Sequence, residues 1–286
     1  MSESESAGAV WSVAEALARA RAAGVQRLDA QLLLAHALAR PRSWLLAHGD
    51  ALLDADQVRW LQARLIRHAD GEPLAYLLGE QAFHGLTLNV TADVLVPRPD
   101  TEVLVDWALE LLGVAFAGIE HPAVVDLGCG SGAIALAVKL GQPQASVIGT
   151  DNSMAALAVA RANALRLGLD VGFAHGSWWS AVPAQRFHLA LANPPYIAAG
   201  DPHLPALRHE PADALSPGGD GLRALRQIVQ GAAAHNVPGG WLLLEHGHDQ
   251  APAVQRLLHA AGFESVGTRL DLGGRQRCTG GRCAQG

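Results

Sequence analysis

The sequence predicts an α/β fold, in which a mainly parallel sheet lies between helices and follows a small helical domain. From about residue 121 onward, short apolar runs alternate with amphipathic helical segments, as in repeated βαβ units. Residues 11–70 show helical periodicity alone. The 286 residues, half of them hydrophobic, suffice for a main domain and a smaller one. We expect a helical domain at 1–80, a β-hairpin with a connecting helix at 81–113, and the α/β domain at 114–286.

The first domain is predicted to be helical throughout residues 11–70. Ser12 and Glu15 form a capping-box pattern at the start of its first helix. Further helices are expected at 28–40, which stops before a proline, and at 54–71.

Alternation of apolar and polar residues over 82–96 predicts the hairpin, and a helix that Gly113 ends follows at 97–113. In the α/β domain, strands are expected at 123–128, 146–151, 170–176, 187–193 and 240–247. Helices are expected at 132–141, 154–168, 222–235 and 251–262, and a last antiparallel pair begins at 263.

Composition excludes several classes of protein. A formal net charge of -6 argues against a protein that binds by neutralising many phosphates. Cys129, Cys278 and Cys283 are odd in number and have no framework spacing, which favours a reduced cytoplasmic chain. Met1–Gly8 is rich in Ser and Glu, so no secretory signal is expected. The apolar runs are shorter than the roughly 20 residues of a membrane helix.

A glycine-rich loop connects the first strand of the α/β domain to its helix. Gly128, Gly130 and Gly132 let a ligand approach the backbone, and the amides at the helix start favour negative groups. Asp126 puts a carboxylate against this loop. Asp151, at the end of the next strand, can accept hydrogen bonds from both hydroxyls of an adenosine ribose. The alternative is a tight turn in which Asp151 caps a helix.

The charges near this loop favour a cationic nucleoside over NAD. Asp126 and Asp151 are negative, and the neighbouring sequence has no Lys or Arg for a pyrophosphate. S-adenosylmethionine fits, because its sulfonium is positive and its carboxylate can use the loop amides. Ser177 and Trp178 follow the third strand, near the expected adenine position. Packing at the surface is the alternative for Trp178 and Trp179.

The segment Asn-Pro-Pro-Tyr follows the fourth strand, at the sheet edge where open α/β sheets bind ligands. A planar amide or amino nitrogen is a poor nucleophile and needs acceptors for its N–H bonds. The Asn193 side chain and the Pro194 carbonyl can accept them, Pro195 restricts the backbone, and Tyr196 can cover the planar group. We assign Asn193, Pro194 and Tyr196 as catalytic and Asn193–Tyr196 as substrate-binding. The alternative is an Asx-type turn.

The motifs "DLGCGSG", "GTD" and "NPPY" together resemble class I, seven-stranded S-adenosylmethionine-dependent methyltransferases of the Asn-Pro-Pro-Tyr group. That group methylates adenine in DNA, guanine in ribosomal RNA, or glutamine. The segments "GEPLAYLLGEQAFHGL", "VLVPRPDTEVLVD" and "HEPADALSPGGDGL" narrow the resemblance to the peptide chain release factor glutamine methyltransferases. It extends over residues 11–283.

The resemblance implies a Rossmann-like sheet of seven strands. It also implies methyl transfer to the side-chain amide of the glutamine in the Gly-Gly-Gln motif of release factors. Together with the residues chosen above, the implied cofactor-binding set is Asp126, Gly128, Cys129, Gly130, Ser131, Gly132, Asp151, Trp178 and Asn193. It further suggests that Arg98, Asp100, Thr101 and Glu102 border the active site, although a helix cap or an ion pair also accounts for these. Cys129 replaces a commoner threonine, and His209 a frequent aromatic.

A neutral glutamine amide needs no basic groove, which suits the charge. The expected partners are release factors bound by the N-terminal helices, with no nucleic-acid requirement, no membrane and a monomeric state. The enzyme alternatives are methylation of a ribosomal-protein glutamine or of an adenine or guanine amino group. The alternative outside the enzymes is a module that binds the cofactor and regulates translation without catalysing a reaction.

No metal site is expected. His246, His248 and Asp249 lack a convincing further ligand, and we expect the histidines to be exposed in a loop. Cys278 and Cys283 are too few for a zinc site. The arginine-rich tail around them is expected to form the last hairpin and a solvated end.

Overall fold

The computed structural model describes residues 10–284, so the prediction for Met1–Gly8 lies outside the described residues. The chain folds into two compact units, Met1–Gly79 and Glu80–Gly286, and each is described by itself. The hairpin and connecting helix belong to the second unit. Within residues 10–284, no helix is both long and apolar enough to cross a membrane.

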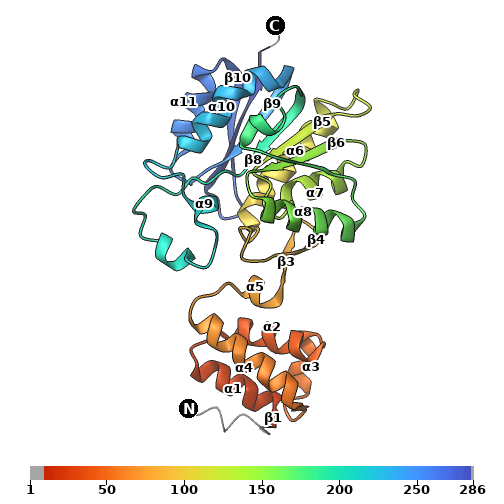
Figure 1. Ribbon diagram of the computed structural model, residues 1–286, viewed down its shortest axis with the longest axis vertical. Helices are drawn as coiled ribbons and strands as arrows, with labels where there is room; N and C mark the ends of the chain where they lie inside the picture. Colours follow the sequence, from red (N-terminus) through yellow and green to blue (C-terminus); the bar gives the residue numbers. More distant parts are fainter. Residues whose placement is uncertain (1–9, 285–286) are drawn as a thin grey trace. The chain divides into compact units, whose positions relative to one another are not determined.

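The first unit is a bundle of helices (Figure 1). Its core is formed mainly by apolar side chains of α1, α2 and α4. Leu33 and Leu34 of α2 are wholly buried there. The elements in chain order are β1 Trp11–Ser12, α1 Val13–Ala22, α2 Arg27–Leu38, α3 Arg42–Ala47, β2 Leu52–Leu53, α4 Ala55–Ala69 and α5 Leu74–Leu78.

The capping box predicted at Ser12 and Glu15 is confirmed. The amide of Glu15 donates to Ser12 Oγ at 3.2 Å, and the amide of Ser12 donates to Glu15 Oε2 at 2.8 Å. The prediction of helix throughout residues 11–70 is wrong in one respect, because β1 pairs antiparallel with β2. The short helix α5, which follows residue 70, was not predicted, since so few residues show no clear period.

The second unit begins with a hairpin of β3 (Glu80–Phe83) and β4 (Leu86–Asn89), whose turn contains Gly85 at φ 77°. The prediction of a hairpin over 82–96 is therefore displaced, because residues 90–98 form no strand. A 3-10 turn, η2 (Pro99–Thr101), leads into α6 (Glu102–Val114), so Gly113 does not end the helix.

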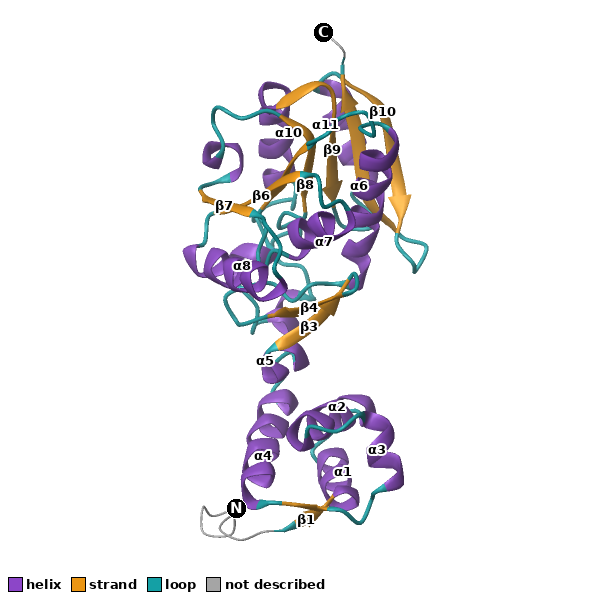
Figure 2. Cartoon of the chain, turned by 90° about the vertical axis from the view of Figure 1, so that its right-hand side faces the viewer, coloured by secondary structure: helices purple, strands orange, loops and turns teal. Residues whose placement is uncertain are grey.

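A seven-stranded sheet forms the body of the second unit (Figure 2), which confirms the predicted fold class. Its strand order is β10-β11-β9-β8-β5-β6-β7, and β11 alone runs antiparallel to its neighbours. The strands are β5 Ala123–Leu127, β6 Ser146–Asp151, β7 Gly172–His175, β8 Phe187–Ala192, β9 Asn236–Glu245, β10 Phe263–Leu270 and β11 Gln276–Cys283.

Helices cover both faces of this sheet (Figure 1). Helices α6, α7 and α8 bury one face of the sheet, and α10 and α11 bury the other. Each face therefore has its own apolar cluster, and both clusters include side chains of the same strands. Leu189 and Ala190, consecutive in β8, belong to opposite clusters, as the period of two in a strand requires. The helices are α7 Ala133–Gly141, α8 Met154–Leu167, α9 Ala212–Leu215, α10 Arg223–His235 and α11 Ala251–Ala260.

The parallel strands bring polar side chains that are far apart in the sequence to one edge. Strands β5, β6, β8 and β9 run in the same direction, so their carboxyl ends lie side by side. Asp151 ends β6, Asn193 follows β8, and Glu245 ends β9. Open α/β sheets bind ligands at this edge.

Asn163 of α8 fastens the hairpin to the glycine-rich loop. Its side chain is wholly buried and accepts from the amide of Asn89 at 2.7 Å. It also donates to the carbonyls of Asn89 and Ser131 at 2.9 and 3.0 Å. A backbone N–H or C=O group that is buried without a hydrogen-bond partner lowers the free energy of unfolding.

We therefore predict that Asn163→Ala lowers the midpoint of thermal unfolding of the full chain by about 5 °C or more, since three backbone groups lose a partner. The control Gln144→Ala shortens an exposed carboxamide and is expected to leave the midpoint in place. Equal midpoints for Asn163→Ala and the wild type would contradict this role.

Candidate active site

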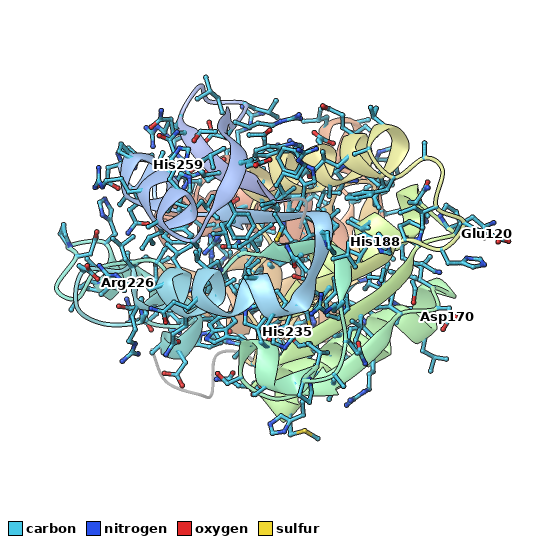
Figure 3. The ribbon with its side chains drawn as sticks, turned by 90° about the horizontal axis from the view of Figure 1, so that it is seen from above. Glu120, Asp170, His188, Arg226, His235 and His259 are labelled. Atoms are coloured by element: carbon cyan, nitrogen blue, oxygen red, sulfur yellow. The ribbon has the colours of Figure 1, made fainter. Side chains whose placement is uncertain are left out.

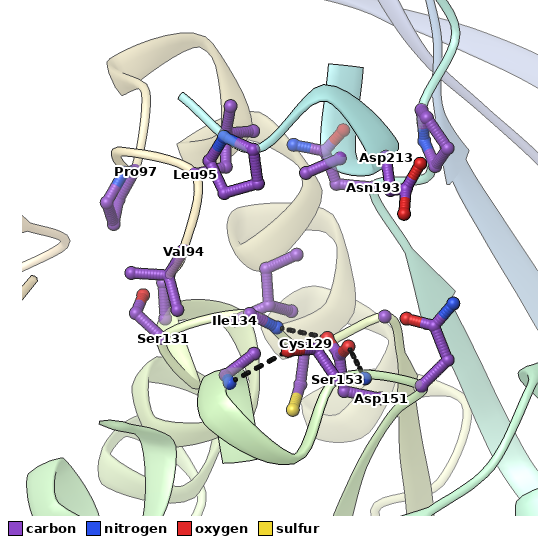
Figure 4. A pocket seen from close by; sticks show the side chains of 18 of the residues that line it. Val94, Leu95, Pro97, Cys129, Ser131, Ile134, Asp151, Ser153, Asn193 and Asp213 are labelled. Atoms are coloured by element: carbon purple, nitrogen blue, oxygen red, sulfur yellow. Dashed lines mark hydrogen bonds between the residues drawn. The ribbon is translucent and has the colours of Figure 1, made fainter. Parts of the chain in front are cut away.

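A cavity of about 270 Å³ opens at the carboxyl edge of the sheet (Figure 4). Figure 4 shows Val94, Leu95 and Pro97 on one side of it, and Cys129 and Asp151 on another. The lining comes from the hairpin-to-α6 connection, the glycine-rich loop, the ends of β6 and β7, the segment after β8, and α9 with the residue before it. Among the predicted site residues, the lining includes Gly128, Cys129, Gly130, Ser131, Asp151, Trp178, Asn193 and Pro195.

The glycine-rich loop is tightly folded against the end of β6. Gly128, Gly130 and Gly132 all have positive φ, and a Cβ at Gly128 would lie 3.1 Å from the ring of Trp178. The amides of Gly128 and Cys129 both donate to the carbonyl of Thr150 at 2.8 Å. Together with Gly130 and Gly132, four loop amides already donate within the protein. Because these four N–H groups already have acceptors within the protein, they are not available to bind an anionic group as the sequence predicted.

Asp151 holds the loop and also faces the cavity. Its Oδ2 accepts from the amide of Gly130 at 2.9 Å, and its Oδ1 accepts from the amide of Ser153 at 2.9 Å. The tight turn of the alternative interpretation is thus present, but the cap of α8 is Ser153, whose Oγ accepts from the amide of Ala156, and not Asp151. Each carboxylate oxygen has a second lone pair, so Asp151 can still accept bonds from a pair of hydroxyls.

Asp126 and Cys129 are more buried than the sequence suggested. Asp126 is wholly buried beneath the loop, outside the cavity lining, and its Oδ2 accepts from the amide of Ala135 at 3.1 Å. Its Oδ1 has no hydrogen-bond partner. Burial raises the pKa of Asp126 to about 7, and the charge of Asp151 adds to the rise. Burial also raises the pKa of the Cys129 thiol, which makes this thiol a poor nucleophile.

The two neighbouring tryptophans differ in role. Trp178 lines the cavity, adopts a left-handed φ of 48°, and donates from Nε1 to Gln227 Oε1 at 3.1 Å. A bulky residue in this region of φ is strained, as is common at ligand sites. Trp179 is buried, donates to the carbonyl of Ile228 and stacks on His235. The packing interpretation therefore holds for Trp179.

The segment after β8 presents Asn193 to the cavity. Asn193 Nδ2 donates to Thr101 Oγ1 at 3.2 Å, so the Oδ1 atom, on the other branch of the planar carboxamide, is not engaged in this bond. Pro195 lines the cavity and Pro194 is buried. Tyr196 is not part of the lining, and its hydroxyl donates to Glu245 Oε1 at 3.4 Å.

Glu245 was not among the predicted site residues. It is 1% exposed, its Oε1 accepts from the Tyr196 hydroxyl, and its Oε2 has no hydrogen-bond partner. Burial raises the pKa of Glu245 to about 7. The sequence feature that could have identified Glu245 is its position at the end of an apolar strand, directly before His246.

The last hairpin is confirmed, and one arginine of this tail is buried within it. Arg277 of β11 is 8% exposed, and it pairs with Asp100 at 3.0 Å and with Asp271 at 3.2 Å. The expectation of exposed histidines is wrong for His246, which is wholly buried with its Nε2 2.7 Å from Thr279 Oγ1. Arg277 and His246 are buried because β11 lies inside the sheet, between β9 and β10.

The buried carboxylate of Glu210 joins two segments at the rim of the cavity, the residues before η2 and those before α9. Glu210 accepts from the amide of Val96 at 3.1 Å and forms an ion pair with Arg98. The interpretation of Arg98 as an ion-pair residue is therefore correct. Glu102 accepts from the amide of His84, which joins α6 to the hairpin.

The cavity is lined by more acidic than basic side chains. Asp93, Asp151 and Asp213 line it, whereas its basic lining residue, Arg98, is paired with Glu210. Such a lining favours cationic or neutral ligands over polyanions.

The histidines do not converge. Figure 3 shows His188, His235 and His259 on different elements and well apart. In the described part of the chain, residues 10–284, no group of three or more His, Cys, Asp or Glu side chains is arranged to hold a metal ion.

The chain matches known protein families and curated relatives. Residues 102–247 match the family model "Methyltransferase small domain", and residues 11–79 match "PrmC N-terminal domain". The release factor glutamine methyltransferase of Xylella fastidiosa (strain Temecula1) is 49% identical over 271 residues, which cover 94% of this chain and 97% of the relative. That of Bordetella pertussis (strain Tohama I) is 50% identical over 262 residues, covering 90% and 95%.

Two solved structures share the fold. A 16S rRNA N2 G1207 methyltransferase of T. thermophilus, in complex with AdoMet and guanosine, has a TM-score of 0.53 at 20% identity and covers 71% of this chain and 49% of that one. The N-terminal domain of human METTL16 in complex with SAH has a TM-score of 0.53 at 14% identity and covers 70% and 76%.

The buried carboxyl of Asp126 predicts a pH dependence of stability. The pKa of Asp126 in the folded chain, about 7, lies above the ordinary value of 3.8, so the folded chain holds this proton more tightly than the unfolded chain. The stability that this proton contributes is complete below pH 3.8 and is lost as the pH rises to 7. We expect the free energy of unfolding of the wild type to fall by about 2 kcal/mol relative to Asp126→Asn between pH 5 and pH 7. Urea unfolding at a series of pH values measures this.

The control Asp170→Asn removes an exposed carboxylate and leaves the Asp126 site intact. Parallel pH curves for Asp126→Asn and the wild type would show that Asp126 ionises normally in the folded chain.

Proposed function

The chain belongs to the family of release factor glutamine methyltransferases, and from this membership we propose that it methylates the glutamine of the Gly-Gly-Gln motif in peptide chain release factors. S-adenosylmethionine is the methyl donor, and the side-chain amide nitrogen of the glutamine is the acceptor. The supporting observation is that Asn193 and Asp151 line one acidic cavity at the carboxyl edge of the sheet.

The residues present fit S-adenosylmethionine, which supplies an electrophilic methyl group on a positively charged sulfur. Asp151 has lone pairs available for the two ribose hydroxyls, and Trp178 offers an aromatic face beside the glycine-rich loop. A side chain at Gly128 would meet Trp178, so the loop approaches this ring closely only as glycine. We propose that Asp126 acts from beneath the loop by fixing the start of α7, and that Ser131 and Gly132 complete the binding loop.

The Asn-Pro-Pro-Tyr segment is proposed to orient the glutamine amide. The lone pair of an amide nitrogen is delocalised, so the nitrogen must face the methyl group in line while its N–H bonds point elsewhere. Asn193 Oδ1 accepts one N–H, because Nδ2 is engaged with Thr101. The carbonyl of Pro194 accepts the other, and Pro195 restricts its direction. Positioning of this kind supplies several kcal/mol of the barrier without a general base.

Tyr196 is proposed to support this segment from behind rather than to act as a base. Burial, the nearby Glu245 charge and the hydrogen bond to Glu245 raise the pKa of its hydroxyl above the ordinary value. A hydroxyl that stays protonated in this way donates a stable hydrogen bond to Glu245.

The negative charge of the cavity and of the chain favours a protein substrate over a nucleic acid. Three aspartates line the cavity, and the formal net charge of the chain is -6. A nucleobase would bring phosphates to this rim, whereas a peptide loop brings none. We therefore propose that the chain needs no nucleic acid, that residues 1–80 recognise the release factor, and that the enzyme acts as a monomer.

Methyl transfer from labelled S-adenosylmethionine tests the substrate. The purified release factor is expected to be labelled on its Gly-Gly-Gln glutamine, as mapped by mass spectrometry, with no added nucleic acid. Ribosomal RNA, DNA and purified ribosomal proteins serve as competing substrates. Label on any of these, with none on the release factor, would reverse the assignment.

Asn193→Ala tests the catalytic role. We expect kcat to fall by about 100-fold or more, because the amide nitrogen loses its orientation. The affinity for S-adenosylmethionine, measured by titration calorimetry, is expected to fall only modestly. Gln185→Ala removes an exposed carboxamide outside the cavity lining and serves as the control. A kcat equal to that of the wild type would exclude the role assigned to Asn193.

A further inference from the structure

The carbonyl of Tyr196 is held by a side chain from outside the cavity lining. Gln250 lies in the turn between β9 and α11 and is not among the residues that line the cavity. Its Nε2 donates to the Tyr196 carbonyl at 2.9 Å, and its Oε1 accepts from the amide of Gly247 at 2.9 Å. A backbone N–H can only donate, so the bond to Gly247 fixes which end of the carboxamide faces Tyr196.

The peptide unit that joins Tyr196 to Ile197 is held at both of its polar groups. Gln250 donates to its carbonyl, and its N–H donates to the carbonyl of Leu215, the last residue of α9, at 3.0 Å. A peptide unit is planar, so bonds from two different elements to its two polar groups fix its orientation.

This orientation bears on the two prolines that precede it. Pro195 restricts ψ of Pro194 to a range of about 40° rather than to one value. The ring of Pro195 fixes its own φ and provides no N–H by which the segment could be held. The direction of the Pro194 carbonyl therefore also depends on where the chain is fastened beyond Pro195, and the bond from Gln250 fastens it there.

Gly221 leaves the room that this contact needs. It has a φ of 78°, and a Cβ on it would overlap the Tyr196 oxygen and lie 2.9 Å from Gln250 Nε2. Gly218, in the same loop, has a nearly equal φ of 77°, but a Cβ there would have no neighbour within 4 Å. An alanine at either position meets the same backbone strain, and the one at Gly221 also displaces the contact between Gln250 and Tyr196.

We propose that Gln250 is a positioning residue for methyl transfer, which fixes the peptide unit after Pro195 and thereby aims the Pro194 carbonyl at the substrate amide. This inference rests on the proposed function, since it concerns how the glutamine is held. Gln250 touches neither the substrate nor the cofactor in this account. Its loss lowers the rate of the methyl-transfer step and leaves the affinity for S-adenosylmethionine unchanged.

Single-turnover methyl transfer to the release factor, with saturating S-adenosylmethionine, tests this for Gln250→Glu. The variant keeps the length of the side chain and an acceptor for Gly247, but an ionised carboxylate cannot donate to the Tyr196 carbonyl. Its rate is expected to fall by about 10-fold or more, because small displacements of positioned groups cost this much. Titration calorimetry is expected to give the wild-type affinity for S-adenosylmethionine.

Gly221→Ala and Gly218→Ala are the matched pair. Gly221→Ala is expected to lose rate by about the same factor as Gln250→Glu, whereas Gly218→Ala should retain most of the rate. The double variant of Gln250→Glu and Gly221→Ala should be no slower than the slower single variant, because both changes remove one contact. Hydrogen–deuterium exchange of the free chain gives a readout without substrate, in which the Ile197 amide should exchange faster in Gln250→Glu than in the wild type.

Equal rates for Gln250→Glu and the wild type would overturn the inference. An equal loss in Gly218→Ala and Gly221→Ala would also overturn it, since it would indicate backbone strain alone, as would losses that multiply in the double variant. If the wild type itself transfers no methyl group to the release factor, the proposed function fails instead. Exchange of the Ile197 amide at the wild-type rate in Gln250→Glu would overturn the anchoring role of Gln250 whatever the substrate is.

Discussion

The hydrogen bond from Asn193 Nδ2 to Thr101 Oγ1 is the interaction on which the account of catalysis depends. An asparagine side chain presents either a donor or an acceptor to a ligand, and the partner of its far atom decides which. Here the partner is the hydroxyl of Thr101, a buried residue. The acceptor is thus held ready before any substrate arrives, which is the usual requirement of catalysis by positioning.

The sheet makes this arrangement possible. Asp151, Asn193 and Glu245 are separated by about 40 to 95 positions in the sequence, yet parallel neighbours in the sheet end at the same edge. The surrounding loops have little regular structure and are fastened by polar contacts instead. Glu210 ties the residues before η2 to those before α9, and Asn163 ties β4 to the glycine-rich loop. The cavity is therefore bounded by irregular backbone that a few buried side chains hold in place.

Much of this site follows from local sequence pattern. The glycine-rich loop, Asp151 and Asn193 were identified because each follows a strand whose apolar run is evident, and the structure brings all three to one cavity. Sequence could not reveal Thr101 as the partner of Asn193, because the two are 92 positions apart and no periodicity relates them. Glu245 and Arg277 were missed for a related reason. Their burial results from β11 lying between β9 and β10, a topology that local patterns do not specify.

A ternary crystal structure with S-adenosylhomocysteine and the release factor tests the central claim most directly. The account predicts that the glutamine side-chain nitrogen lies within hydrogen-bond distance, about 2.7 to 3.2 Å, of Asn193 Oδ1, with Nδ2 still on Thr101. A glutamine held by other residues, or an Asn193 side chain that turns its Nδ2 toward the substrate nitrogen, would contradict it.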